Sequence, residues 1–186
     1  HAKVQSTESS PVSYNAFDPE LQLWVAACLY KGFEDIERLY GDPSSLTEET
    51  YQNGAVMGTT LQMPREMWPP TRADFETYWN TTVDTLEIDP VIRAHLLSIA
   101  RGEFLGPVVS TLFGWWFELL TIGFLPENFR DKMGVTLAPW QRTLFDAHNL
   151  IVGTVVRHLP PPLRAFPLNA LLADVRWRMR TGRPLV

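Results

Sequence analysis

The sequence predicts an all-α fold: a single-domain bundle of about six to eight helices that spans residues 1–186. Three observations predict it. Apolar residues recur at spacings of three and four through most of the chain. N-capping residues and proline or glycine breaks delimit these segments. No alternating strand pattern, hairpin turn or internal repeat accompanies them, so neither a sheet nor a solenoid is expected.

Composition bounds the class of protein. Of the 186 residues, 45% are hydrophobic and 20% are charged, which excludes a disordered chain and a polytopic membrane protein. The formal net charge of −5 argues against a nucleic-acid partner. The single cysteine excludes an internal disulfide framework and agrees with a reducing, cytoplasmic location.

The first predicted helix runs from Asp18 to Gly41. Asp18 can accept amide hydrogens of the first turn, Pro19 suits the first helical position, and Gly41 precedes a proline-containing turn that ends the helix. Apolar residues at helical spacing predict the side that faces the core. That side comprises Leu21, Trp24, Val25, Cys28, Leu29, Ile36 and Leu39.

Four residues of this helix carry further expectations. Gly32 lies on the apolar side, where its missing Cβ would let another helix approach or, in the less common case, a flat ligand. Cys28 is expected to be a packed thiol rather than a nucleophile. Glu34 falls on the polar side, and its spacing predicts an ion pair with Arg38.

Seven further helical segments are predicted downstream. Thr47, Thr71 and Asp89 are the expected N-caps of the first three, and glycine or proline ends most of the segments. Gly54 and Gly58 are interpreted as a site of close helix packing. The predicted ranges are 48–61, 72–86, 90–101, 107–125, 126–133, 138–159 and 167–180.

Apolar ridges are predicted on two of these helices. One side of the helix over 90–101 carries Val91, Ile92, His95, Leu96 and Ile99. The expected inner ridge of the helix over 138–159 comprises Trp140, Leu144, Ala147, Ile151 and Val155.

The segment 107–125 is the most apolar of the chain, and its length approaches that of a membrane span. Glu118 in its second half, with Gly114 and Gly123, favours a core helix, with insertion into or contact with a membrane as the alternative. The last helix is basic, with arginines at 176, 178, 180 and 183. Complementing the helix dipole explains them better than a phosphate or anionic-lipid contact does.

No self-sufficient catalytic motif is found along the chain. The HExxH, Cys-x-x-Cys, Gly-x-Ser-x-Gly, P-loop and Rossmann patterns are absent, which argues against zinc and non-haem di-iron sites. His95 and His148 have no partner at metal-ligand spacing, so each is interpreted as a satisfied or half-buried structural histidine. The chain begins with His1-Ala2-Lys3-Val4, which reads like the middle of an element, so an upstream segment is expected; a removed signal peptide or a proteolytic end would look the same.

Several loose motifs, in this order and spacing, resemble one known family. HAKV and a short polar loop precede Tyr14-x-Ala16-x-Asp18-Pro19, and the central helix then continues as Leu21-x-Leu23-Trp24-Val25-Ala26-Ala27-x-Leu29. The likeness covers nearly the whole chain, and it is to short actinobacterial members of the DUF2236 family, the catalytic domain shared by latex-clearing rubber oxygenases and the oxygenase MpaB. The further motifs are Met67-Trp68-Pro69, Thr121-x-Gly123-Phe124-Leu125-Pro126, Leu159-Pro160-Pro161-Pro162-Leu163-Arg164 and Gly182-Arg183-Pro184-Leu185.

The resemblance implies a haem b-dependent oxygenase with a globin-like helical core that oxidises or cleaves C=C bonds of an isoprenoid or lipid-like substrate. It implies that His1 of the HAxV motif is the proximal iron ligand. Trp24, Leu29 and the aromatic segment Phe113 to Phe117 are the expected walls of the cofactor and substrate pocket.

Two departures from the family pattern bear on this expectation. Many short members have Trp-Val-His where this chain has Trp24-Val25-Ala26, so any role of that histidine is lost here. The Arg/Lys-Thr segment and the distal carboxylate associated with oxygen chemistry would lie upstream of His1.

Two alternative functions therefore stay open: a non-catalytic helical module for an apolar ligand or partner, and a membrane-associated subunit. The expected partners are a hydrophobic small molecule or lipid, with peripheral membrane contact, homo-oligomerisation or association with the upstream segment left open.

Overall fold

The computed structural model describes residues 5, 6, 8 and 14–184, and of Pro167 the backbone alone. This part is all-α, as predicted, with one isolated antiparallel bridge between Gln5 and Asn15. Eight of its helices have seven residues or more, which agrees with the expected number. The helices are α1 (Pro19–Leu39), α2 (Glu48–Gly54), α3 (Val56–Thr60), α4 (Arg72–Thr85), α5 (Pro90–Ala100), α6 (Pro107–Phe124), α7 (Glu127–Met133), α8 (Pro139–His158), α9 (Pro161–Arg164) and α10 (Phe166–Thr181).

Local capping fixes where these helices begin and end. The four predicted N-caps Asp18, Thr47, Thr71 and Asp89 each accept a backbone N–H of the first turn at 2.7 to 3.2 Å. Gly134 ends α7 in the left-handed conformation, with φ of +58°. The predicted boundaries are confirmed to within about two residues, except that the segment 48–61 forms two short helices.

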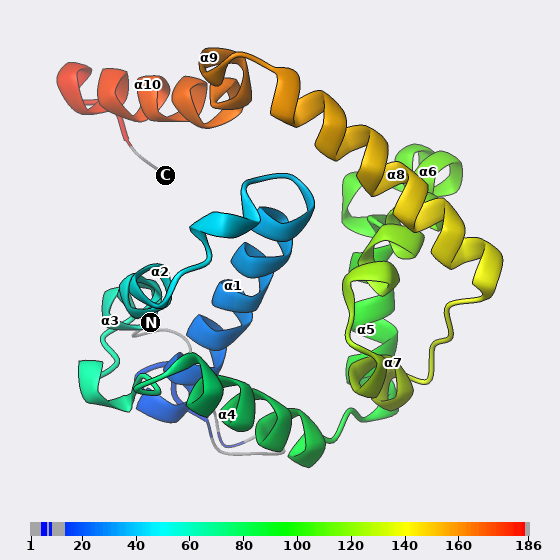
Figure 1. The fold of residues 1–186 in the computed structure, drawn as a ribbon, viewed down its shortest axis with the longest axis horizontal. Coiled ribbons are helices and arrows are strands. Elements are labelled where there is room, and N and C mark those ends of the chain that lie inside the picture. The colour runs from blue at the N-terminus through cyan, green and yellow to red at the C-terminus, as the bar shows by residue number, and fades with distance from the viewer. Residues whose placement is uncertain (1–4, 7, 9–13, 185–186) are drawn as a thin grey trace.

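The helices form two clusters and an extension (Figure 1). α1 to α4 make one cluster, and α5 to α8 make the other. α8 also crosses the C-terminal end of α1, where Gly153 lies against the main chain of Leu39 and the Tyr40 hydroxyl donates a hydrogen bond to the buried Asn149. α9 and α10 continue from α8 along the edge of the molecule.

An aromatic cluster forms the core of the first group of helices. Tyr30 of α1 packs edge-on against three rings: Tyr51 of α2, Trp68 of the segment between α3 and α4, and Phe75 of α4. The ring centroids are 5.2 to 5.7 Å apart. All four side chains are less than 2% exposed. The Tyr51 hydroxyl donates to the carbonyl of Pro69 at 2.6 Å, so the polar atom inside this cluster is satisfied.

Two glycines let α2 and α3 approach α1, which confirms the packing interpretation of the Gly54–Gly58 pair. A Cβ at Gly54 would lie 2.7 Å from the ring of Tyr30. A Cβ at Gly58 would lie 2.6 Å from the Met63 methyl group and 3.3 Å from Ala26.

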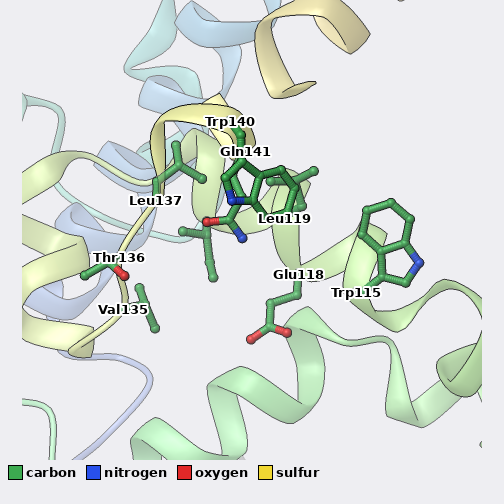
Figure 2. Close-up of a pocket in the computed structure, with 9 residues that line it drawn as sticks. Trp115, Glu118, Leu119, Val135, Thr136, Leu137, Trp140 and Gln141 are labelled. Atoms are coloured by element: carbon green, nitrogen blue, oxygen red, sulfur yellow. The ribbon is translucent and has the colours of Figure 1, made fainter. Parts of the chain in front are cut away.

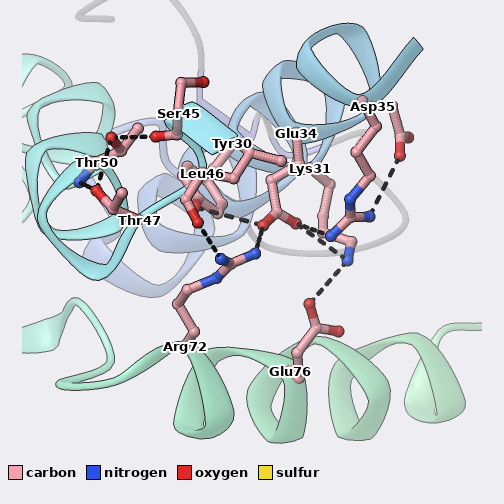
Figure 3. A network of polar contacts seen from close by, with 11 residues as sticks. Tyr30, Lys31, Glu34, Asp35, Ser45, Leu46, Thr47, Thr50, Arg72 and Glu76 are labelled. Carbon is pink, nitrogen blue, oxygen red and sulfur yellow. Dashed lines mark hydrogen bonds and ion pairs between the residues drawn. The ribbon is translucent and has the colours of Figure 1, made fainter. Parts of the chain in front are cut away.

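A buried carboxylate beside Tyr30 joins α1 to α4 (Figure 3). Glu34 is fully buried and forms an ion pair with Arg72, whose second guanidinium nitrogen donates to the carbonyl of Leu46 at 2.6 Å. Lys31 and the predicted partner Arg38 lie 3.5 and 3.6 Å from the other carboxylate oxygen. The prediction that Glu34 lies on a polar side is wrong, since its side chain is fully buried. Three nearby basic side chains offset the free-energy cost of burying this charge.

The predicted inner side of α1 is mostly exposed, although Trp24 and Leu39 are half-buried. Its buried side comprises Gln22, Leu23, Ala26, Ala27, Tyr30 and Glu34, whereas Leu21, Val25, Leu29 and Ile36 are 43% to 54% exposed. Cys28 is exposed too, which overturns its prediction as a packed thiol. Hydropathy periodicity selected the more apolar side, but the two alanines permit closer helix packing and therefore form the contact.

The predicted ridges on α5 and α8 are likewise mostly exposed. On α8 the buried residues are Phe145, Asn149 and Gly153, whereas Trp140 and Ile151 are more than 60% exposed. On α5 only Ala100 is buried.

The chain therefore exposes more surface than a compact protein of its size. Its accessible area is 12,736 Å². A compact monomer of 21.2 kDa is expected to expose about 9,100 Å². The excess is of the size that obligate interfaces bury, and much of it comes from apolar faces of α1, α5, α8 and α10.

Helix α6 is long and apolar enough to cross a membrane by length and composition, with a mean hydropathy of 1.3. In the described residues 17% of this window is buried. Core helices of soluble proteins that pass the same test are mostly buried, so the low burial of α6 does not bear out the prediction of a core helix.

Two glycine substitutions are expected to change stability in opposite directions. A Cβ at Gly153 would lie 2.4 Å from the carbonyl oxygen of Leu39, so Gly153→Ala should lower the free energy of unfolding by about 1–2 kcal/mol. Gly32 has no atom within 4 Å of its Cβ position, so Gly32→Ala should raise it by about 1 kcal/mol. Urea unfolding of both variants tests the helix crossing; equal effects would contradict it.

Candidate functional site: the outer face of α1

The exposed apolar side of α1 is the candidate site. We call it the outer face, and it consists of Leu21, Val25, Cys28, Leu29, Gly32 and Ile36. These residues recur at spacings of three and four, so their side chains share one side of the helix. Because the opposite side of α1 is packed against α3, the outer face is free to bind another surface or a ligand.

Gly32 opens the middle of the outer face. No atom lies within 4 Å of where its Cβ would be, so the predicted close approach of another helix is not seen. The helix backbone is therefore accessible between apolar side chains, and a flat apolar ring can lie directly on it.

A pocket of about 380 Å³ continues the outer face toward the N-terminal end of α1. This volume lies within the range typical of small-molecule sites. We call it the α1 pocket, and its lining is almost entirely apolar. The lining residues are Tyr14, Ala16, Leu21, Gln22, Trp24, Val25 and Leu61.

Gln22 supplies a buried polar group at the wall of this pocket. Its Nε2 donates to the carbonyl of Ala16 at 2.9 Å, while its buried Oε1 has no hydrogen-bond partner. An unpaired buried acceptor costs free energy unless a ligand or water donates to it. Gln22 lies outside the apolar side that periodicity predicts for this helix, so the sequence pattern does not identify it.

Of the two predicted wall residues of α1, one lines the α1 pocket and the other does not. Trp24 is half-buried, lines the α1 pocket and stacks on Trp79 with centroids 5.1 Å apart, while Leu29 lies on the outer face. The predicted iron ligand His1 lies outside the described residues. Residues 113–117 of α6 do not line the α1 pocket.

Cys28 provides a reporter on the outer face, because it is the single thiol of the chain. The residue is exposed as a whole, yet desolvation of its sulfur by neighbouring groups raises the pKa of the thiol to about 11. At neutral pH the neutral thiol therefore predominates, so Cys28 is not a ready nucleophile.

The histidines in the described part of the chain lie away from the outer face. His95 is exposed on α5, whereas the sequence predicts a satisfied or half-buried structural histidine. His148 is half-buried as expected, with its ring 5.1 Å from that of Trp116. Within the described residues, no group of three or more His, Cys, Asp or Glu side chains could hold a metal ion.

A second cavity of about 340 Å³ lies between α6 and the start of α8 (Figure 2). Two of its polar residues already have structural partners. Glu118 forms an ion pair with Arg101 at 2.9 Å, which raises the pKa of the arginine, and Gln141 accepts the N–H of Ala138 at 2.8 Å. With these groups engaged, the cavity is a weaker candidate for a reaction site than the α1 pocket.

The profile of the family described as "ER-bound oxygenase mpaB/B'/Rubber oxygenase, catalytic domain" matches residues 1–165. The chain belongs to this family. This membership confirms the resemblance inferred from the sequence motifs, and the family is one of oxygenase catalytic domains.

Two mycobacterial proteins are similar to the chain over its whole length. They are the uncharacterized protein Rv2237 of Mycobacterium tuberculosis and the uncharacterized protein Mb2261 of Mycobacterium bovis, each 42% identical over 188 residues. The match covers 100% of this chain and 74% of each relative. No solved structure matches the chain significantly, so a globin-like arrangement of the helices stays a prediction.

The described residues of this family member fit a flat apolar cofactor. The outer face offers an open glycine between aliphatic side chains, and the α1 pocket adjoins it.

Proposed function

We propose that this protein is a haem b-dependent oxygenase that oxidises or cleaves C=C bonds of an unsaturated isoprenoid or lipid-like substrate. The observation that carries the proposal is the glycine-centred outer face of α1 in a chain that belongs to an oxygenase family. A cytoplasmic location and a hydrophobic small-molecule or lipid substrate complete the proposal.

The residues of the chain have separate roles in this proposal. Haem b would supply the iron centre for chemistry with O₂. The outer face, including Leu29, would bind the porphyrin and exclude water from it, while His1 would hold the iron. Trp24 and the α1 pocket would hold the apolar substrate, and Gln22 Oε1 would accept a hydrogen bond from a polar end of that substrate.

Ala26 favours a second candidate, a non-catalytic module that binds an apolar ligand or partner. This position is fully buried against α3, with its Cβ 3.3 Å from that of an alanine placed at Gly58. The side chain at position 26 therefore packs against α3 and is not part of the outer face. The histidine that many short members of the family carry at this position has no counterpart in this chain.

Haemin titration of the purified protein tests the proposal. We expect a Soret band that is lost or shifted in His1→Ala, and alkylation of Cys28 that slows as the Soret band grows. The alkylation is run at pH 9, because a thiol pKa of about 11 makes the reactive thiolate roughly a hundredfold more abundant there than at pH 7.

A pair of variants locates the bound haem. Gly32→Leu fills the open space of the outer face and should weaken haemin binding, whereas Ala147→Leu at an exposed position of α8 should not. A protein that stays colourless with haemin would overturn the haem proposal. Co-purified lipid without haem binding would favour the non-catalytic module.

A further inference from the structure

Helix α10 lies beyond the matched oxygenase domain. The family match ends at residue 165, and α10 runs from Phe166 to Thr181. It lies at the edge of the molecule, after α9 (Figure 1). Among its described side chains, only Arg178 is half-buried, and the others are exposed. Neither the family membership nor the proposed oxygenase reaction accounts for this helix.

One side of α10 is a continuous apolar stripe. At 100° per residue its members fall within an arc of about 100°, as in a helix that buries one side. Their exposed fractions range from 39% to 66%. The stripe consists of Leu168, Leu171, Leu172, Val175 and Met179.

Arginines flank the stripe, and most of them lack a carboxylate partner. Arg178 pairs with Asp174 at 2.7 Å. Within the described residues, Arg176, Arg180 and Arg183 form no ion pair. Arg183 lies over the ring of Trp177 at 4.3 Å, on the side of α10 opposite the stripe, so Arg176 and Arg180 are the unpaired arginines available beside the stripe. Long arginine side chains beside an apolar stripe can extend its apolar surface while their guanidinium groups reach toward phosphates.

The charge of the chain is distributed unevenly along the sequence, with the positive excess in the C-terminal segment. Residues 164–186 contain five arginines and one aspartate, a net charge of +4. The other residues, 1–163, contain the remaining 11 basic and 20 acidic side chains, a net charge of −9. An anionic surface would therefore attract the C-terminal segment and repel the rest of the chain, which orients the molecule.

We propose that α10 binds the surface of an anionic lipid bilayer, lying in the plane of the interface. The apolar stripe enters the boundary between headgroups and acyl chains, and Arg176 and Arg180 contact lipid phosphates. The acidic body of the protein stays on the aqueous side. This contact brings the oxygenase domain to a lipid surface whether or not it binds haem.

Co-sedimentation with vesicles tests the proposal. The full chain should bind vesicles of three parts phosphatidylcholine to one part phosphatidylglycerol, should bind phosphatidylcholine vesicles weakly, and should dissociate as salt is raised. Each arginine near an anionic surface strengthens binding about fivefold, so replacing Arg176 and Arg180 with glutamine should weaken it about 25-fold.

Matched controls separate the stripe and the arginines from general effects. Arg142→Gln removes an exposed arginine of α8 and should leave vesicle binding unchanged. Leu171→Gln should weaken binding to both kinds of vesicle, whereas Leu150→Gln, at an equally exposed position of α8, should not.

Three outcomes would overturn the proposal. The first is the absence of vesicle binding, and the second is equal binding to neutral and anionic vesicles. The third is self-association, measured by light scattering, that Leu171→Gln abolishes. This third result would assign the stripe to a second copy of the chain.

Discussion

Replacing Arg72 with methionine is expected to lower the free energy of unfolding by about 3 kcal/mol. Arg72 is the main partner of Glu34, whose carboxylate is fully buried between α1 and α4. Removing one member of a buried ion pair leaves an uncompensated charge, which costs about 3–5 kcal/mol. The lower end applies because Lys31 and Arg38 remain near the carboxylate and Arg72 is itself 32% exposed.

The double variant Arg72→Met/Glu34→Gln is the control for this prediction. It removes the charge together with its partner, so it should recover a large part of the lost stability. Urea unfolding of the original protein, of both single variants (Arg72→Met and Glu34→Gln) and of the double variant gives the coupling energy between the two side chains. A single variant as stable as the original protein would show that the ion pair does not join α1 to α4.

Phe75→Ala is expected to lower the free energy of unfolding by about 3–5 kcal/mol. The Phe75 ring is 1% exposed and contacts Tyr30, Tyr51 and Trp68 at centroid distances of 5.2 to 5.7 Å. Its truncation leaves a cavity among rings that are held by α1, α2 and the segment before α4 and cannot all move inward.

Phe104→Ala is the matched control, because Phe104 is 75% exposed. Its effect should stay within about 0.5 kcal/mol. Thermal unfolding monitored by circular dichroism measures both variants. Similar effects of the two truncations would contradict a core centred on the aromatic cluster.

Helix ends could be predicted from the sequence because they depend on neighbouring residues. Asp18, Thr47, Thr71 and Asp89 each cap a helix through contacts within three residues, and the structure confirms all four. The family could be predicted for a related reason, since its motifs are short and their order is preserved along the chain.

The buried side of α1 could not be predicted in this way. Both sides of the helix are apolar, and which one packs depends on the distant glycines of α2 and α3. The burial of Glu34 likewise depends on Arg72, which lies 38 residues away along the chain. The unpaired oxygen of Gln22 follows from a contact with Ala16 that no periodic pattern encodes.

The large accessible area of the chain has a consequence for its unfolding transition. A chain of this mass exposes about 30,700 Å² when unfolded, so the 12,736 Å² of the folded state leaves about one-sixth less area to be exposed than in a compact protein. The denaturant dependence and the heat capacity change of unfolding both scale with this area, so both should be reduced by a similar fraction. A cofactor, lipid surface or protein partner that covers the apolar faces would therefore make the transition steeper as well as move its midpoint.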